Sequence, residues 1–564
     1  MPNTTTGILT AVLDWVALHP ALATALWISA YFWYKVIDYI VIAPYCSPLQ
    51  DLPGPPKPGK FFDLRDFGAV MNTITSYKTQ QELREQYGKN IRIQGFGYWD
   101  QRLVTYDIKA INYILCQATE LYQKPWQTRR MLCRLLGDGM PFTEGDQHKR
   151  QRKILSPAFS PQSLRNCYPI FHQKAVELRD RWSGLVNHSL ADSTVLDLHH
   201  WIARATFDTF AAAGFDFHLG AIQNEDNEVY QAYKQMFEAT INKGQTFRGF
   251  LEIYMPWLDW AWPNAGSRQV NRSKDVIKKA GEHMLKTKRD AIVRAQSGNI
   301  DAEKDILPKN QKDMLSLMIK SNLSENQKLT DSEILAQIHS FLFVGSDSIS
   351  MCISWTLHYL SLNPALQSRL RTELLSHAPF TSSSSSRDIA SLPFLDAVVK
   401  ESLRIAAPVH STLRVATCDD TIPTEDGVGV KINKGEFIHL PYEALNMAKE
   451  IWGEDAWEFN PDRWFKLPEA AKQIPALISG LSSFSVGSHS CAGMQFAIME
   501  AKAYIAELVN SFEFTPVPDQ KILKMNIITT KPFVSGQYTK GPQLPMIVRP
   551  YVPPTTTEVG TPAP

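Results

Sequence analysis

The sequence lacks the marks of several protein classes. Its 58 lysines and arginines balance 57 aspartates and glutamates, leaving a net charge of +1 in 564 residues, so it has no general attraction for nucleic acid. The seven cysteines are scattered, odd in number and without a CxxC pair, which argues against a disulfide framework or a zinc site and favours a reducing compartment. Neither an internal repeat nor a flavin or nicotinamide fingerprint is visible. What remains is an ordinary globular composition, 44% hydrophobic and 20% charged, with ample material for a core.

Basic residues are nearly missing from the first 56 positions, where Lys35 is the only lysine or arginine. The apolar run Ala21–Tyr34 is shorter than the ~20 residues of a membrane span. It lengthens toward Ile42 if Lys35 extends its ammonium to the membrane interface, or back toward Ile8. We therefore predict a single-pass membrane anchor within residues 1–50. A buried core helix is the alternative, and a cleaved signal peptide fits less well because a basic N-terminal region is missing.

Proline marks the segment after the anchor. Residues 51–60 read Asp-Leu-Pro-Gly-Pro-Pro-Lys-Pro-Gly-Lys, which predicts a stiff hinge that cannot be helical; a ligand for SH3-type domains is the alternative. Lysine and arginine become common only from here on, which places the C-terminal bulk in the cytosol. We predict one catalytic domain over residues 61–550 and a disordered tail, rich in proline and threonine, over residues 551–564.

Two other segments show patterns of their own. Alternating apolar and polar residues near Ile91–Gly95 and Arg102–Tyr106 predict a short β-hairpin. The segment Phe247–Trp262 is dense in aromatic side chains. Two interpretations are equally good: the segment is a lid that dips into a bilayer, or its aromatic side chains pack in the protein core.

One cysteine lies in a distinctive loop, Phe484-Ser-Val-Gly-Ser-His-Ser-Cys-Ala-Gly493. Gly487 and Gly493 are able to take backbone angles closed to other residues, and apolar residues at helical spacing follow the loop. A helix N-terminus and nearby N–H groups lower a thiol pKa, and a thiolate is a strong, soft ligand for iron. Cys491 is thus a candidate iron ligand covered by Phe484, with a buried core thiol as the alternative.

An acid and hydroxyls interrupt a long apolar helix. Thr330-Asp-Ser-Glu333 is a capping box that predicts a helix start, and the helix continues through Phe343-Val-Gly-Ser-Asp-Ser-Ile-Ser350. Serine and glycine weaken a helix, so we expect a local opening here. Asp347 in such surroundings must be paired or functional, and with Ser348 it is able to form a proton relay. A polar helix face is the alternative.

A basic helix is predicted near Glu144–Lys153. His148 and Arg152 lie at i and i+4 and therefore share a face. The run also contains Lys149, Arg150 and Lys153. A solvated basic face is the usual meaning of such a run, and docking of an acidic electron-transfer partner is another.

Taken together, these motifs resemble the cytochrome P450 family, with insertions in the style of its fungal membrane-bound members. The resemblance covers about residues 50 to 550 and depends on five motifs in the family's order. These are the basic helix, the acid–alcohol helix, Glu401-x-x-Arg404, Pro461-x-Arg463-Trp and the Cys491 loop. The fold implied is mainly α with a small β region, preceded by the membrane anchor.

The resemblance also implies roles for the candidate site residues. Cys491 is the axial ligand of haem b, iron protoporphyrin IX, and Asp347 and Ser348 handle protons, with Ser348 where the family has threonine. His148, Arg152, Arg414 and His489 hold the haem propionates; the family has arginine where this chain has His489. Three further segments gain structural roles. Glu401 with Arg404 and Arg463 forms a charge lock behind the Cys loop, Val409–Thr412 lines the substrate pocket, and Asn526–Pro532 closes it.

The activity implied is monooxygenation, in which one oxygen atom of O₂ enters a hydrophobic small molecule such as a terpenoid or another secondary metabolite. Because the chain shows no flavin or nicotinamide fingerprint, the electrons are expected from a separate NADPH-cytochrome P450 reductase. The location implied is the membrane of the endoplasmic reticulum, with the catalytic domain in the cytosol. Two alternatives stay open: a haem-thiolate isomerase or dehydratase that needs neither O₂ nor reductase, and a non-catalytic haem binder or membrane scaffold.

Overall fold

The computed structural model describes residues 13–56, 65–70, 72–187, 193–244, 248, 252, 255, 257–296, 313–321, 329–377 and 389–553. The second half of the predicted hinge and most of the predicted tail lie outside these residues. So do Phe247, Phe250 and Tyr254 of the aromatic segment.

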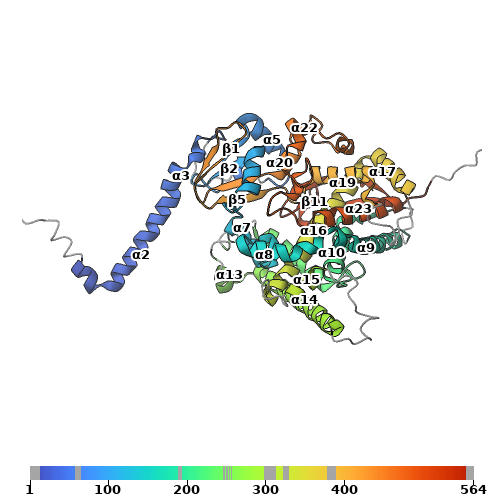
Figure 1. Cartoon of the computed structure of the whole chain (residues 1–564), viewed down its shortest axis with the longest axis horizontal. Coiled ribbons are helices and arrows are strands. Elements are labelled where there is room, and N and C mark those ends of the chain that lie inside the picture. The colour runs from blue at the N-terminus through green and yellow to red at the C-terminus, as the bar shows by residue number, and fades with distance from the viewer. Residues whose placement is uncertain are drawn as a thin grey trace, which may run out of the picture.

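The N-terminal helix α2 (Pro20–Ile37) extends away from the body (Figure 1). The chain joins the body on the side where β1 and β2 lie. It continues through η1 (Asp38–Ile42) and α3 (Ala43–Cys46) to η2 (Pro48–Asp51). The run Pro20–Asp51 is long and apolar enough to cross a membrane, and none of its most apolar window is buried. Trp27, for example, is 77% exposed. The alternative of a buried core helix is therefore wrong for the described chain.

The largest sheet lies on the side of the body from which the N-terminal helix emerges (Figure 1). It has the strand order β1-β2-β8-β5-β3, in which β2 and β8 are parallel and the other pairs are antiparallel. The predicted hairpin is confirmed as β1 and β2, joined from Gln94 to Gln101. The strands of this sheet are β1 (Asn90–Gln94), β2 (Gln101–Thr105), β3 (Tyr122–Gln123), β5 (Thr412–Ala416) and β8 (Phe437–Leu440).

Three smaller sheets complete the β structure of the described residues. They are the hairpin β10–β11, the pair β6–β7 and the sheet β4-β12-β9. Their strands are β4 (Thr194–Asp197), β6 (Asp420–Ile422), β7 (Val430–Ile432), β9 (Phe512–Pro516), β10 (Ile522–Asn526), β11 (Thr530–Val534) and β12 (Pro545–Pro550).

Helices make up the rest of the body, and the long helix α16 (Asp331–Leu362) crosses its centre (Figure 1). It packs against α10, α14, α19 and α23. The predicted capping box starts it, because the Thr330 hydroxyl accepts the N–H of Glu333 at 3.2 Å and the Glu333 carboxylate accepts the N–H of Thr330 at 2.9 Å. The prediction of a mainly α fold with a small β region is confirmed.

The other helices are α4 (Arg65–Val70), α5 (Ser76–Tyr87), α6 (Ile108–Asn112), α7 (Trp126–Leu136), α8 (Gly145–Leu155), α9 (Pro161–Asn187), α10 (Leu198–Phe215), α11 (Glu228–Gly244), α13 (Trp257–Ala261), α14 (Ala265–Gln296), α15 (Met314–Ser321), α17 (Pro364–His377), α19 (Pro393–Ile405), α20 (Tyr442–Asn446), α21 (Lys449–Trp452), α22 (Glu469–Lys472) and α23 (Met494–Ser511).

Two large apolar cores and a small cluster around Trp355 hold the described body together. The larger core joins α9, α10, α16 and α23, and includes Trp182, Phe210 and Tyr504. The smaller core lies under the five-stranded sheet and includes Ile91 and Trp452. The end of the aromatic segment is not part of either core, because Trp257 and Trp262 are 60% and 72% exposed. Core packing is therefore the wrong interpretation for these two tryptophans.

Candidate active site

Backbone geometry shapes the loop that carries Cys491. Gly487 has φ of +78°, and a Cβ at this position would lie 1.9 Å from the carbonyl oxygen of Leu115, so only glycine fits. The N–H of Cys491 donates to the carbonyl of Phe484 at 2.9 Å, and α23 begins just after the loop. Gly493 has φ of −93°, a region open to every residue, so the loop uses the freedom of glycine at Gly487 and not at Gly493.

The Cys491 thiol is exposed yet closely surrounded by protein atoms. This burial raises the pKa of the thiol. The N–H of Gly493 and the guanidinium of Arg152 oppose this effect but do not overcome it. The N–H group that the sequence predicts is therefore present, while burial outweighs its effect in the metal-free protein. A coordinated metal ion would remove the proton instead.

Iron at Cys491 would need further ligands. Among the described residues, no group of three or more His, Cys, Asp and Glu side chains is placed to hold a metal ion. A single thiolate fits a metal whose other ligands belong to a macrocycle, as in haem. The donor set thus fits iron protoporphyrin and does not fit a metal held by protein side chains alone.

A polar cluster lies beside the cysteine loop, between α8 and the segment that precedes α7. The rings of His148 and His489 lie 4.0 Å apart between centroids. His489 contacts Glu144 through Nε2 at 2.9 Å and accepts from the Lys124 ammonium at Nδ1 at 3.1 Å. Burial lowers the pKa of His148 to about 3 and also lowers the pKa of His489, so both imidazoles are neutral at pH 7.

Three cations of this cluster stay charged at pH 7. Burial lowers the pKa of Lys124 to about 8, and Arg152 and Arg414 remain guanidinium ions. Burial would raise the pKa of Glu144, but His489 and Lys124 hold it at about 2, so Glu144 is the one carboxylate facing these cations. The cluster therefore has a net positive charge, to which Arg129 also contributes, and this suits the anionic propionates of a haem.

The two arginines contact neutral oxygens in the described structure. Arg152 donates to the carbonyl of Ser490 at 2.6 Å and to its hydroxyl at 3.2 Å. Arg414 is 2% exposed and donates to the Thr412 hydroxyl at 2.7 Å and to the carbonyl of Leu413 at 2.8 Å. Neither guanidinium is neutralised by these bonds, so both retain charge for an anionic group.

The geometry predicts different effects at positions 489 and 124. His489→Arg should retain haem at least as well as the parent, because an arginine is able to keep the contact with Glu144 and adds a permanent charge. Lys124→Met should lose haem about tenfold faster, which corresponds to about 1.4 kcal/mol and is near the value of a hydrogen bond to a charged group. The measurement is the rate of haem transfer to apomyoglobin, with Lys109→Met as the control. Faster loss from His489→Arg would mean that the imidazole has a role of its own.

The carboxylate of Asp347 in α16 is held by the hairpin β10–β11. It contacts the Lys531 ammonium at 2.6 Å and accepts from the Thr529 hydroxyl at 2.6 Å. Burial alone would raise the pKa of Asp347, but Lys531 and Thr529 bring it below its ordinary value. Nearby His199 of α10 is neutral, because burial lowers its pKa to about 3. Asp347 is therefore ionised and paired.

Ser348 turns its hydroxyl to its own helix, donating to the carbonyl of Val344 at 2.8 Å. Ser346 and Ser350 do the same, and α16 runs through this segment without a break, so the expected local opening is wrong. Gly345 has a packing role, since a Cβ there would lie 2.1 Å from the Phe210 ring. The hydroxyl and the carboxylate lie on neighbouring residues but do not bond to each other in the described structure.

Two chain segments are bonded to each other near α16. The Thr530 hydroxyl donates to the carbonyl of Ala407 at 2.6 Å and its N–H to that of Pro408 at 3.0 Å. These bonds tie the hairpin β10–β11 to the segment that begins β5. Val409, which follows Pro408 in the segment that begins β5, is 43% exposed. This placement supports the expected pocket-lining role of both segments.

A buried carboxylate braces the chain behind the cysteine loop. Glu401 of α19 is fully buried and contacts Arg404 at 2.8 Å and Arg463 at 2.9 Å. Arg404 also donates to the carbonyl of Asn446 at 2.7 Å, and the Asn446 amide donates to the Ser483 hydroxyl at 2.8 Å. Ser483 lies in the turn that leads into the loop. The predicted charge lock is thus present and is bonded through to the Cys491 loop.

Sequence reasoning did not name Lys124, and it placed Thr529 and Lys531 only within the pocket-closing segment Asn526–Pro532, not as partners of Asp347. Lys124 is separated from His489 by 365 positions, and Lys531 from Asp347 by 184. No local periodicity marks them. The sequence does indicate that an acid in an apolar helix, such as Asp347, needs a partner. It does not indicate which residue that partner is.

Comparison with known proteins agrees with this geometry. The family model for cytochrome P450 matches residues 56–538. Cytochrome P450 monooxygenase 205 of Postia placenta is 34% identical, over 92% of this chain and 96% of its own length. A ganoderic acid synthetase of Ganoderma lucidum is 31% identical over 86% and 90%, and the monooxygenase claW of Ampulloclitocybe clavipes is 28% identical over 92% and 96%. The chain therefore belongs to the cytochrome P450 family of monooxygenase enzymes, whose members carry haem.

Proposed function

We propose that this enzyme inserts one atom of O₂ into a hydrophobic small molecule, a terpenoid or a similar secondary metabolite, with electrons from NADPH-cytochrome P450 reductase. The single observation that carries the proposal is the exposed Cys491 thiol in its glycine-shaped loop, beside a cluster with net positive charge. This arrangement suits haem b. Relatives that include a ganoderic acid synthetase support a role in secondary metabolism.

Each part of the chain has a distinct task in this reaction. Bound haem supplies an iron atom at which O₂ is activated. Cys491 donates charge to that iron, while Lys124, Arg152 and Arg414 bind the propionates and so orient the ring. The Asp347 carboxylate accepts and releases protons beside the substrate site. The Ser348 hydroxyl passes a proton onward when it rotates away from the carbonyl of Val344.

Membrane attachment and electron supply are assigned to separate surfaces. We assign the anchor to the run Pro20–Asp51, whose most apolar window is not buried against the body. Exposed Trp257 and Trp262 suit a second contact with the membrane interface. Lys149 on α8 is 59% exposed and Lys153 is also exposed, as a basic docking face for a reductase requires. These features support the endoplasmic reticulum membrane, with the body in the cytosol.

Reconstitution separates this proposal from its rivals. The haem-loaded protein, supplied with lipophilic substrates such as terpenes, should form oxygenated products only when NADPH, reductase and O₂ are all present. A haem-thiolate isomerase or dehydratase would turn over without reductase. A haem-binding scaffold would give no product with any substrate. Product formed in the absence of NADPH and reductase would contradict the proposal.

Ser348→Ala tests the proton role directly. We expect product per NADPH to fall about tenfold and hydrogen peroxide to rise in its place, because proton transfer by a positioned group is worth 10²–10⁴ and water replaces part of it. Ser346→Ala is the matched control, since its hydroxyl also bonds back to α16 but is buried. Equal coupling in the parent and in Ser348→Ala would remove Ser348 from the relay.

Lys531→Met should move the acid limb of the pH profile. In the parent, Lys531 lowers the pKa of Asp347 against the effect of burial. Without the ammonium, burial raises that pKa above the ordinary value, so Asp347 takes up a proton at a higher pH and product formation falls earlier on acidification. Lys524→Met is the control, because Lys524 neutralises another buried acid, Glu443, from the same hairpin at 2.5 Å. An equal shift in both variants would show that the effect is structural.

A further inference from the structure

The helix α14 carries an excess of positive charge. Between Ala265 and Gln296 it has nine lysines and arginines but only three aspartates and glutamates. Some of these cations are neutralised by the body of the protein. Lys288, for example, is buried and contacts Asp216 at 2.8 Å and Asp313 at 3.0 Å. The cations on the outer face of the helix are different.

Four cations form a stripe along the exposed face of α14. They are Arg268, Arg272, Lys279 and Lys286. Their spacing of four and seven residues places them on one side of the helix, over a length of about 27 Å. Within the part of the chain that the structure describes, none of the four has an acidic partner or a side-chain hydrogen bond. Asp275 and Asp290 share this face, so the basic stripe keeps two surplus positive charges.

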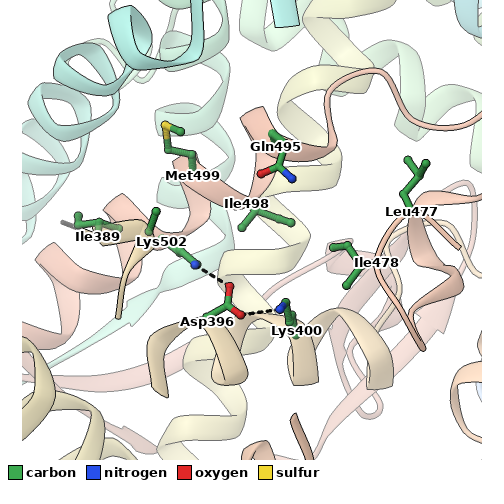
Figure 2. A pocket seen from close by; sticks show the side chains of 10 residues that line it. Ile389, Asp396, Lys400, Leu477, Ile478, Gln495, Ile498, Met499 and Lys502 are labelled. Carbon is green, nitrogen blue, oxygen red and sulfur yellow. Dashed lines mark hydrogen bonds and ion pairs between the residues drawn. The ribbon is translucent and has the colours of Figure 1, made fainter. Parts of the chain in front are cut away.

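Lysines elsewhere on the body are balanced by nearby acids. In the pocket between α19 and α23, Lys400 and Lys502 both contact the Asp396 carboxylate at 2.6 Å (Figure 2). The carboxylate of Glu373 also acts on Lys502, so two acids face two ammonium ions there. The basic stripe lacks this balance and therefore attracts anions from outside the chain.

The basic stripe begins beside the exposed tryptophans of the aromatic segment. The Asn264 side chain caps the first turn of α14 by accepting the N–H of Ser267 at 2.7 Å. Trp262 thus lies only six residues before Arg268. Figure 1 shows α13, which contains Trp257, and α14 together at the lower edge of the body. Because tryptophan favours the interface between membrane and water, this edge suits a membrane surface.

We propose that the basic stripe of α14 binds the anionic phospholipid headgroups of the cytosolic leaflet, such as those of phosphatidylserine. The proposal rests on the membrane attachment assigned above. Each basic side chain close to an anionic leaflet gains roughly a factor of five in affinity, and the attraction fades beyond about 8 Å at physiological salt. A leaflet offers charge along the whole stripe and also accepts the neighbouring tryptophans, whereas an acidic protein would match the charges alone.

Acetylation of lysines in phospholipid nanodiscs tests this proposal. The full-length, haem-loaded protein is placed in discs of phosphatidylcholine, with or without an equal part of phosphatidylserine, and the rate at each lysine is followed by mass spectrometry. Lys279 and Lys286 should react at least about fivefold more slowly when phosphatidylserine is present. Salt at about 1 M should restore the rate, because it shortens the screening length to about 3 Å. Lys472 on α22 is the control, since it is 48% exposed and lies at the opposite edge of the body (Figure 1).

A double variant keeps both reporter lysines while weakening the stripe. Arg268→Gln with Arg272→Gln should lose most of the protection at Lys279 and Lys286. Its matched control is Arg165→Gln with Arg549→Gln, which removes the same charge from exposed positions outside α14 and should keep the protection.

Four results would overturn the proposal. Three are equal rates in the two kinds of disc, protection that persists at high salt, and equal loss in the two double variants. The fourth is protection by the reductase in neutral discs without any effect of phosphatidylserine, which would assign the stripe to an acidic protein. The anchor holds the protein in both kinds of disc and no measurement needs turnover, so each of these results would leave the monooxygenase proposal standing.

Discussion

Cys491→Ala is expected to abolish the red-shifted Soret band that the reduced protein shows with carbon monoxide, and to abolish all substrate oxidation. The band reports a thiolate bound to haem iron, and the chain has one cysteine beside Arg152 and the N–H of Gly493. Burial keeps the free thiol protonated, so the iron itself must displace the proton. Alanine offers no ligand at all, and the loss should be complete rather than partial.

A second cysteine provides the control for this experiment. Cys352 of α16 is buried, and burial raises the pKa of its thiol to about 12. No cationic side chain offsets this effect, so Cys352 is an inert core thiol. Cys352→Ala should therefore keep the full Soret band and activity. A band that persists in Cys491→Ala would end the assignment of the axial ligand, and a band lost only in Cys352→Ala would transfer it.

Local features of the site were predictable from sequence because they depend on neighbours in the chain. The capping box at Thr330, the hairpin β1–β2 and the loop glycine Gly487 all follow from spacing and residue type. The positions of Cys491 and Asp347 also follow from local motifs. Each of these needs only a few adjacent residues to be specified.

Burial and long-range pairing were not predictable in the same way. The N–H group that lowers the pKa of Cys491 is visible in the sequence, but the burial that outweighs it depends on the whole fold. The partner of Asp347 comes from a hairpin near the C-terminus. The prediction that the serines open α16 was wrong for a related reason. Their hydroxyls donate to carbonyls of the same helix and leave it unbroken. The boundaries set at residues 50, 60 and 550 stay predictions.

Glu401→Ala is expected to prevent accumulation of folded, haem-loaded protein. The Glu401 carboxylate is fully buried and is the acceptor for Arg404, Arg463, the N–H of Asn460 and the indole N–H of Trp464. Removing it leaves two buried guanidinium groups, with only the partly exposed Asp455 as an acidic partner of Arg463. Breaking a buried pair in this way costs about 3–5 kcal/mol, a large share of the 5–15 kcal/mol that stabilise a typical domain.

The neighbouring ion pair of Arg369 and Asp462 gives the matched comparison. Both side chains are about half exposed, at 48% and 53%, and an exposed pair is worth about 0–1 kcal/mol. Asp462→Ala should therefore yield as much carbon monoxide-binding protein as the parent, with a nearly unchanged midpoint of thermal inactivation. The difference between the two variants isolates burial, since both remove one carboxylate near η7 (Pro461–Trp464). Normal haem content in Glu401→Ala would mean that the loop around Cys491 is positioned without the lock, through the packing of Phe484 and the backbone of Gly487 alone.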